Sequence, residues 1–226
     1  MKQIELGPLN IKEALRYLGY GKNSPDENTE EIIRECEKDV LKAARPRYTY
    51  KIFDIKEVDN GIELVNTSLV LTGNSIKSHL KGCDKAVCIA ATISADIDKL
   101  IRVRQLSDMT KAVITDSLSS VAIEQLCDKI EEQLRIEYPD YFQTFRFGIG
   151  YGDLPIKLQG EFLNILNAGK QIGLNVSSSC MLTPTKSVTS IMGLSKIPVQ
   201  SGRKGCATCN MREICKFRGE GGHCNG

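Results

Sequence analysis

The most apolar run of the chain covers residues 85–94, with the sequence KAVCIAATIS. Its short length and its β-branched side chains predict a central strand of a sheet rather than a helix. No run reaches the roughly 18 uncharged apolar residues that a transmembrane helix requires. The chain has 226 residues, enough for one large domain with a small appendage. Its hydrophobic content of 41% is sufficient for a core around this strand.

Helix and strand patterns on both sides of this run predict a mixed α+β domain. The Asp59-Asn60-Gly61 turn predicts a hairpin, because Asn and Gly tolerate the positive φ angles that tight turns use. Pro46 ends the helix that begins at residues 25–27. Periodicity predicts the other helices at 11–20, 76–80, 107–135 and 156–169, with one of about ten residues after the apolar run. The remaining expected strands are 48–55, 62–65 and 180–182, and 183–196 is expected to be irregular or a strand pair.

The charges are nearly balanced, with 30 Lys and Arg against 28 Asp and Glu and a net charge of +2. This balance argues against a general nucleic-acid-binding protein. The beginning of the chain carries acidic residues and lacks an apolar segment of the kind found in secretory signals. We therefore expect a cytoplasmic protein without a nucleic-acid or membrane partner.

The nine cysteines fall into two groups. Without an export signal, a scaffold of disulfides is not expected. Four of the cysteines lie within the last 21 residues. The other five are scattered over the body of the chain, where an unpaired cysteine usually acts as a small buried hydrophobic residue: Cys36, Cys83, Cys88, Cys127 and Cys180.

The last four cysteines follow the spacing C-x2-C-x5-C-x8-C. Four thiolates so close together favour an iron–sulfur cluster or zinc. Zinc ribbons usually contain two Cys-x-x-Cys pairs, and this tail has one, so a [4Fe–4S] cluster is the preferred interpretation and Zn is the alternative. His223 is an alternative to the last cysteine as a ligand. The expected metal ligands are Cys206, Cys209, Cys215 and Cys224.

A glycine-rich segment at 146–155, RFGIGYGDLP, is the strongest candidate for ligand binding in the body. Its three glycines allow a ligand to approach the backbone closely. A dinucleotide-binding fingerprint is excluded, because Asp153 occupies the position of its third glycine and Pro155 follows. Arg146 can form paired hydrogen bonds with a carboxylate, and Tyr151 offers a flat face and a hydroxyl. From spacing alone, a structural turn before a helix fits equally well.

The pattern Arg-x3-Gly-Tyr, followed by Pro and then Gln159, resembles the AdoMet-binding signature of the activation domain of cobalamin-dependent methionine synthase. The later run 181–190, MLTPTKSVTS, resembles the Ser-rich segment of the same domain. The likeness covers roughly residues 80–195. It implies a stand-alone form of this domain that binds S-adenosylmethionine, and it assigns the loop contacts by position. Arg146 would hold the methionyl carboxylate, Phe147 would supply backbone contacts, and Gly150 and Tyr151 would line the pocket.

The resemblance also implies an acidic residue on the helix before the loop. The register suggests Glu124, with Ser120 at the alternative position. Independently, a rotation of about 100° per residue places Glu124 on one helix side with the small residues Ser117, Ser120 and Cys127. A side rich in small residues would let a ligand approach the helix.

The family reactivates cobalamin by trapping Co(I) as methyl-Co(III) with the methyl group of AdoMet. A corrinoid protein or methionine synthase would carry the cobalamin, because this chain contains no Asp-x-His-x-x-Gly motif. No catalytic side chain is expected, since methyl transfer requires only positioning. The tail would relay electrons, and its basic residues would meet an acidic electron donor protein. The alternative is a non-catalytic AdoMet-binding or docking module with a zinc tail. The cysteine spacing argues against a radical AdoMet enzyme.

Together these patterns predict an α+β fold with two parts. Residues 1–196 would form a single AdoMet-binding domain, with a mainly antiparallel sheet packed by helices. Residues 197–226 would form the small Cys-rich metal-binding tail.

Overall fold

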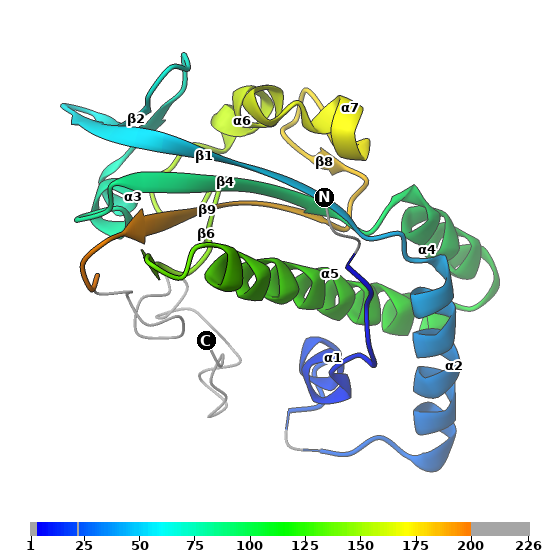
Figure 1. Ribbon diagram of the computed structural model, residues 1–226. Helices are drawn as coiled ribbons and strands as arrows, with labels where there is room; N and C mark the ends of the chain where they lie inside the picture. The colour runs from blue at the N-terminus through cyan, green and yellow to red at the C-terminus, as the bar shows by residue number, and fades with distance from the viewer. Residues whose placement is uncertain (1–3, 22, 200–226) are drawn as a thin grey trace. The chain divides into compact units, whose positions relative to one another are not determined.

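The computed structural model describes residues 4–21 and 23–199 (Figure 1). The described chain divides into two compact units, each assembled from separate segments. The first contains the chain up to Thr49, Ala90–Leu134 and Asn167–Val188, and the second contains Tyr50–Ile89, Arg135–Leu166 and the described residues from Thr189 onwards.

Helices dominate the first unit, and polar caps mark where they begin. The carboxylate of Asp26 accepts a hydrogen bond from the Thr29 amide at 2.7 Å and so caps the second helix. This cap accounts for the predicted start of that helix at residues 25–27. The elements that begin in this unit are α1 (Ile11–Tyr17), α2 (Glu27–Ala43), β1 (Arg47–Val58), α4 (Ala95–Ser107), α5 (Met109–Glu137), α7 (Ala168–Ile172), β7 (Asn175–Val176), β8 (Leu182–Thr183) and β9 (Ser187–Ser195).

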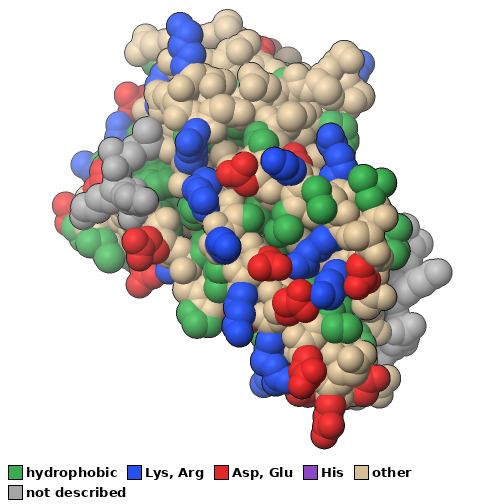
Figure 2. All heavy atoms as spheres, turned by 90° about the vertical axis from the view of Figure 1, so that its right-hand side faces the viewer, with side chains coloured by type: hydrophobic (Ala, Val, Ile, Leu, Met, Phe, Trp, Pro, Cys, Tyr) green, Lys and Arg blue, Asp and Glu red, His purple; other side chains and the backbone are tan. Residues whose placement is uncertain are grey.

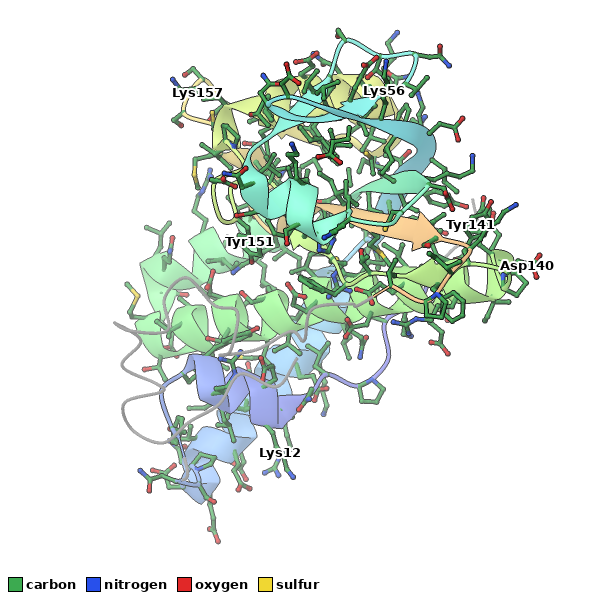
Figure 3. The ribbon with its side chains drawn as sticks, turned by 90° about the vertical axis from the view of Figure 1, so that its left-hand side faces the viewer. Lys12, Lys56, Asp140, Tyr141, Tyr151 and Lys157 are labelled. Atoms are coloured by element: carbon green, nitrogen blue, oxygen red, sulfur yellow. The ribbon has the colours of Figure 1, made fainter. Side chains whose placement is uncertain are left out.

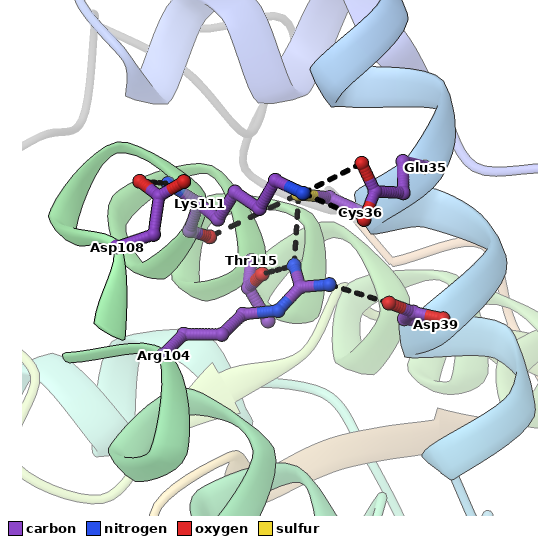
Figure 4. A network of polar contacts seen from close by, with 7 residues as sticks. All are labelled: Glu35, Cys36, Asp39, Arg104, Asp108, Lys111 and Thr115. Atoms are coloured by element: carbon purple, nitrogen blue, oxygen red, sulfur yellow. Dashed lines mark hydrogen bonds and ion pairs between the residues drawn. The ribbon is translucent and has the colours of Figure 1, made fainter. Parts of the chain in front are cut away.

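A polar network joins α2, α4 and α5 within the first unit (Figure 4). The Arg104 side chain is only 9% exposed, and its guanidinium forms an ion pair with Asp39. It also donates to the Cys36 sulfur at 2.8 Å and to the Thr115 hydroxyl. These partners satisfy a buried cation that would otherwise destabilise the fold.

The sheet lies mostly in the second unit. Its strand order is β3 (Val70–Thr72), β2 (Gly61–Leu64), β1, β4 (Lys85–Thr92), β9 and β5 (Phe142–Gln143), and β6 (Phe147–Gly148) also pairs with β9. Strands β2, β3, β5 and β6 pair antiparallel with β1, β2, β9 and β9, respectively. The apolar run at 85–94 forms β4 inside this order, and seven of its eight residues are buried. The predicted α+β class with a mainly antiparallel sheet is therefore confirmed.

The strands β3, β5 and β6, of two or three residues each, are not predicted by the sequence patterns. The remaining elements are α3 (Asn74–His79), the 3-10 helix η1 (Ile156–Leu158) and α6 (Gln159–Leu166).

The β1–β2 hairpin is confirmed, but the predicted reason for its turn is wrong. Val58 pairs with Gly61, and neither Asn60 nor Gly61 adopts a positive φ angle. Glycine is required at position 61 for another reason, because a Cβ there would collide with the backbone carbonyl of Leu71 on β3. Gly61 is therefore needed for the close contact between β2 and β3 and not for a left-handed backbone in the turn.

Two segments near the end of the domain differ from expectation. The predicted helix at 156–169 is divided into η1, α6 and the start of α7, and the break between α6 and α7 lies at Asn167, which adopts a left-handed conformation with φ 55°. The segment 183–196, expected to be irregular or a strand pair, contains the nine-residue strand β9. Pairing with β4, β5 and β6, all of which are distant in sequence, organises this Ser- and Thr-rich stretch as a strand.

The expectation that the scattered cysteines are buried is confirmed for Cys36, Cys88 and Cys127, each at most 1% exposed. Cys83 and Cys180 are partly exposed. The four tail cysteines lie outside the described residues. Within the described ranges, no helix is long and apolar enough to cross a membrane. On the face drawn in Figure 2, basic and acidic side chains are interspersed, in keeping with the balanced composition.

Candidate functional site

The glycine-rich loop leaves the sheet at β6. Phe147 pairs with Ile191 of β9, and Gly148 pairs with Ser190. The chain then reverses, because the Tyr151 amide donates to the Gly148 carbonyl at 3.1 Å. The Leu154 amide in turn donates to the Tyr151 carbonyl at 3.0 Å. The loop is therefore an ordered pair of turns attached to a buried strand.

Two of the loop glycines adopt backbone conformations that favour glycine, with φ 92° at Gly150 and φ 57° at Gly152. A Cβ at Gly152 would also collide with the side chain of Ser75. A Cβ at Gly150 would lie 2.9 Å from the Cδ1 atom of Ile156. The groups that approach these two glycines closely are side chains of the protein. The approach of a ligand to the loop backbone stays a prediction.

Hydrogen bonds of Asp153 connect the loop to α3. Its carboxylate accepts hydrogen bonds from the backbone amides of Asn74 at 2.7 Å and Ser75 at 2.8 Å. These bonds favour the ionised carboxylate and hold the pKa of Asp153 below its ordinary value. The aspartate that excluded a dinucleotide fingerprint therefore has a structural role in positioning this loop.

His79, at the end of α3, supports the segment that leads into the loop. Its Nε2 atom lies 2.9 Å from the Thr144 hydroxyl oxygen, which accepts a hydrogen bond from the Gly193 amide at 2.7 Å. Burial lowers the pKa of the imidazole to about 4, although hydrogen bonds with the backbone of Ile191 and Phe145 oppose this shift. The imidazole is therefore neutral near pH 7.

Aromatic rings connect His79 to the loop. The imidazole lies 4.6 Å from the Phe145 ring centroid and 5.0 Å from that of Phe147. Phe147 in turn makes an edge contact with Tyr151, with 6.2 Å between centroids. Tyr151 ends this series with 65% of its surface exposed (Figure 3). The loop therefore presents one aromatic face and a hydroxyl from a well-supported base.

The predicted loop residues Arg146, Phe147, Gly150 and Tyr151 lie together in the second unit. Arg146 directly precedes β6 and is partly exposed. This arrangement combines a cationic side chain, a short strand and an exposed aromatic ring within six residues. Such a combination can bind a ligand that carries both a carboxylate and a flat ring.

Glu124 lies on α5 in the first unit, where it is exposed. Burial, followed by neighbouring charges that include Glu13 and Glu124, raises the pKa of Tyr17 to about 12. Glu124 therefore lies close enough to Tyr17 of α1 for its charge to influence the Tyr17 hydroxyl. Ser120, the alternative position, accepts a hydrogen bond from Lys186 Nζ at 2.9 Å.

Other residues of the predicted helix side differ in exposure. Ser117 and Cys127 are 7% and 1% exposed, so they belong to the core. Lys186, which holds Ser120, also forms an ion pair with Asp116 at 2.9 Å. The Ser-rich segment thus contacts α5 within the first unit through Lys186.

The sequence provided little indication of the supporting residues around the loop. His79 showed no partner in its own helix, because Thr144 lies 65 positions away in the chain. The partners of Asp153 lie a similar distance away, at Asn74 and Ser75. Within residues 4–21 and 23–199, no group of three or more His, Cys, Asp or Glu residues is arranged to hold a metal ion.

A solved structure described as the MetH reactivation domain bound to AdoHcy has the same fold. The superposition has a TM-score of 0.62 and covers 85% of this chain and 77% of that chain, with 16% sequence identity. No protein-family model and no curated protein matches the sequence. The fold that the sequence resemblance implied is therefore confirmed.

Proposed function

We propose that this chain is an AdoMet-binding reactivator of a corrinoid methyltransferase. The observation that carries the proposal is the position of the Arg-x3-Gly-Tyr motif. It lies in one ordered, exposed loop of a fold shared with a reactivation domain that was solved with AdoHcy bound. AdoHcy is the product that remains when AdoMet transfers its methyl group, so the two ligands share most of their atoms.

The loop residues have separate roles in this proposal. The guanidinium of Arg146 would donate paired hydrogen bonds to the methionyl carboxylate. Backbone groups of Phe147 and Gly150 would contact the ligand, and Tyr151 would cover it with its ring. Glu124 is proposed as the acidic contact from α5, with Ser120 as the alternative. None of these groups needs to move a proton, because the methyl transfer requires orientation and exclusion of water.

The reaction proposed at this site consumes AdoMet, the Co(II) corrinoid of the partner protein and one electron. One electron from a donor converts Co(II) to Co(I). The electron pair of Co(I) then forms a bond to the AdoMet methyl carbon, while the carbon–sulfur bond breaks and its electron pair remains on sulfur. The products are methyl-Co(III) and AdoHcy. Methylation makes the unfavourable reduction favourable overall by removing Co(I).

The Cys-rich tail, proposed as a separate part at 197–226, would provide the electron relay. The four cysteines supply a thiolate set suited to a [4Fe–4S] cluster, whose potential can reach strongly negative values. Their identities are Cys206, Cys209, Cys215 and Cys224. A cytoplasmic location would keep these thiols reduced, and an electron donor protein would deliver electrons to the tail.

The proposal is tested with the full chain, a Co(II) corrinoid protein, a reductant and AdoMet under anaerobic conditions. We expect the corrinoid absorption spectrum to change to that of methyl-Co(III) only when AdoMet and the full chain are both present. If methyl-Co(III) forms at the same rate without the chain, or does not form with it, the proposed function is wrong.

Metal analysis separates the electron relay from the alternative of a docking module with a zinc tail. Anaerobically purified protein should be brown and contain iron at about four atoms per chain, as a [4Fe–4S] cluster requires. Cys209→Ser should lose this iron, while the described domain remains folded and binds AdoMet. Colourless protein that contains zinc would instead support the docking module.

A further inference from the structure

Ser190 is a buried hydroxyl next to the candidate ligand loop. The residue is 1% exposed, and its Oγ atom has no hydrogen-bond partner among the described residues. A buried hydroxyl without a partner loses its hydrogen bonds to water and gains none in return. Buried polar groups in native proteins are rarely left in this state unless a water, an ion or a ligand completes them.

The position of Ser190 in the sheet relates this hydroxyl to the loop. Ser190 on β9 is directly opposite Gly148 on β6. Opposite residues of antiparallel strands extend their side chains on the same face of the sheet, with Cβ atoms about 5 Å apart. Because Gly148 has no side chain, the space beside Ser190 on that face remains open to another group.

The ring of Tyr151 occupies this space. A Cβ placed on Gly148 would have Tyr151 ring atoms as its three nearest neighbours, at 3.3, 3.4 and 3.4 Å. The ring therefore covers Gly148 on the face that carries Ser190. The Tyr151 side chain is 65% exposed, so the ring that covers this face is itself at the surface.

The ring of Tyr151 can move without disturbing the core. It is mostly exposed, and Phe147 contacts it only edge-on at 6.2 Å between centroids. Gly150 and Gly152 flank it in left-handed conformations that are open to few other residues. Exposed side chains change rotamer within nanoseconds. A rotation of this ring away from Gly148 would expose the Ser190 hydroxyl to a ligand held by the loop.

We propose that Ser190 is a ligand-positioning residue of the AdoMet site, whose hydroxyl forms a hydrogen bond with bound AdoMet after the Tyr151 ring has turned away from Gly148. This role rests on the proposed function, since it assumes that the loop binds AdoMet. It explains an unpartnered hydroxyl that the apolar core does not require. Ser190 positions the ligand and takes no part in methyl transfer.

The test compares the full-length wild-type protein with Ser190→Ala by calorimetric titration with AdoMet and by urea unfolding without ligand. We expect Ser190→Ala to bind AdoMet roughly three- to tenfold more weakly, the loss typical of one hydrogen bond. Without ligand the variant should be at least as stable as the wild type, because it loses no internal hydrogen bond. Ser190→Thr, which keeps the hydroxyl, should bind more tightly than Ser190→Ala.

Gln143 provides a matched control. Both polar atoms of its side chain are buried without a partner among the described residues, and it pairs with Leu194, four residues further along β9 than Ser190. Gln143→Met should leave AdoMet affinity unchanged. Equal affinity of the wild type and Ser190→Ala would overturn the role of Ser190, whereas a wild type that does not bind AdoMet would contradict the proposed function itself.

Discussion

His79 should make the stability of this protein fall sharply in mildly acidic solution. Burial lowers the pKa of its imidazole from 6.5 to about 4 in the folded protein. Between these two values the unfolded chain binds a proton that the folded chain does not. Stability therefore rises with pH in this range, and it decreases as the pH falls below 6.5 until the folded imidazole titrates near 4.

The size of the effect follows from the two pKa values. At about pH 7.5 the imidazole is neutral in both states and contributes almost nothing. At about pH 5 protonation of the unfolded state costs the folded state about 2 kcal/mol, and the total approaches about 3 kcal/mol well below pH 4. The side chain is mostly buried, so little of this difference is screened by water.

Urea unfolding of the wild type and of His79→Gln at several pH values measures this contribution. Glutamine keeps a polar group near Thr144 but does not titrate. The difference in unfolding free energy between the two proteins should change by about 2 kcal/mol between pH 7.5 and pH 5. The shared contributions of the carboxylates and of His223 cancel in that difference. A difference that stays constant with pH would refute the assignment of a neutral, buried imidazole.

Two further substitutions test the loop and the polar network by urea unfolding. Both Gly152 and Gly173 have a positive φ, so replacing either with Ala should lower the unfolding free energy, by about 1 kcal/mol for Gly173→Ala. Gly152→Ala should lower it further, because a Cβ at position 152 would also collide with Ser75. Equal losses would argue against that contact. Arg104→Met should lower the unfolding free energy by about 2 kcal/mol, because it removes the group that donates a hydrogen bond to the buried Thr115 hydroxyl. An unchanged unfolding free energy would mean that the network contributes no stability.

Local patterns were sufficient to predict most elements of the fold. The apolar run at 85–94 and the helical periodicity of 107–135 identified β4 and α5, because burial imposes a regular spacing on strands and helices. The Ser- and Thr-rich stretch at 187–195 carries no such spacing. It becomes β9 by pairing with β4 on one side and with β5 and β6 on the other, all of them distant in the chain.

The candidate site likewise has a part that the sequence predicts and a part that it does not. The ligand loop was identified from its own residues, because Arg146, Gly150 and Tyr151 form a contiguous motif. The support beneath it could not be identified, since His79 and Ser190 acquire their roles only when α3, β6 and β9 come together. A hydroxyl that lacks a partner cannot be recognised in a sequence, because its surroundings are set by tertiary packing.

Calorimetric titration of AdoMet into the full-length protein and its Arg146→Ala variant tests the central claim most directly. The wild type should bind AdoMet saturably at one site, and loss of the guanidinium should weaken binding by about 1.5–3 kcal/mol, or roughly 10- to 150-fold. Lys157→Ala removes a positive charge from an exposed residue just after the loop (Figure 3) and should leave the affinity unchanged. A wild type that does not bind AdoMet, or an Arg146→Ala variant that binds it equally well, would contradict the account.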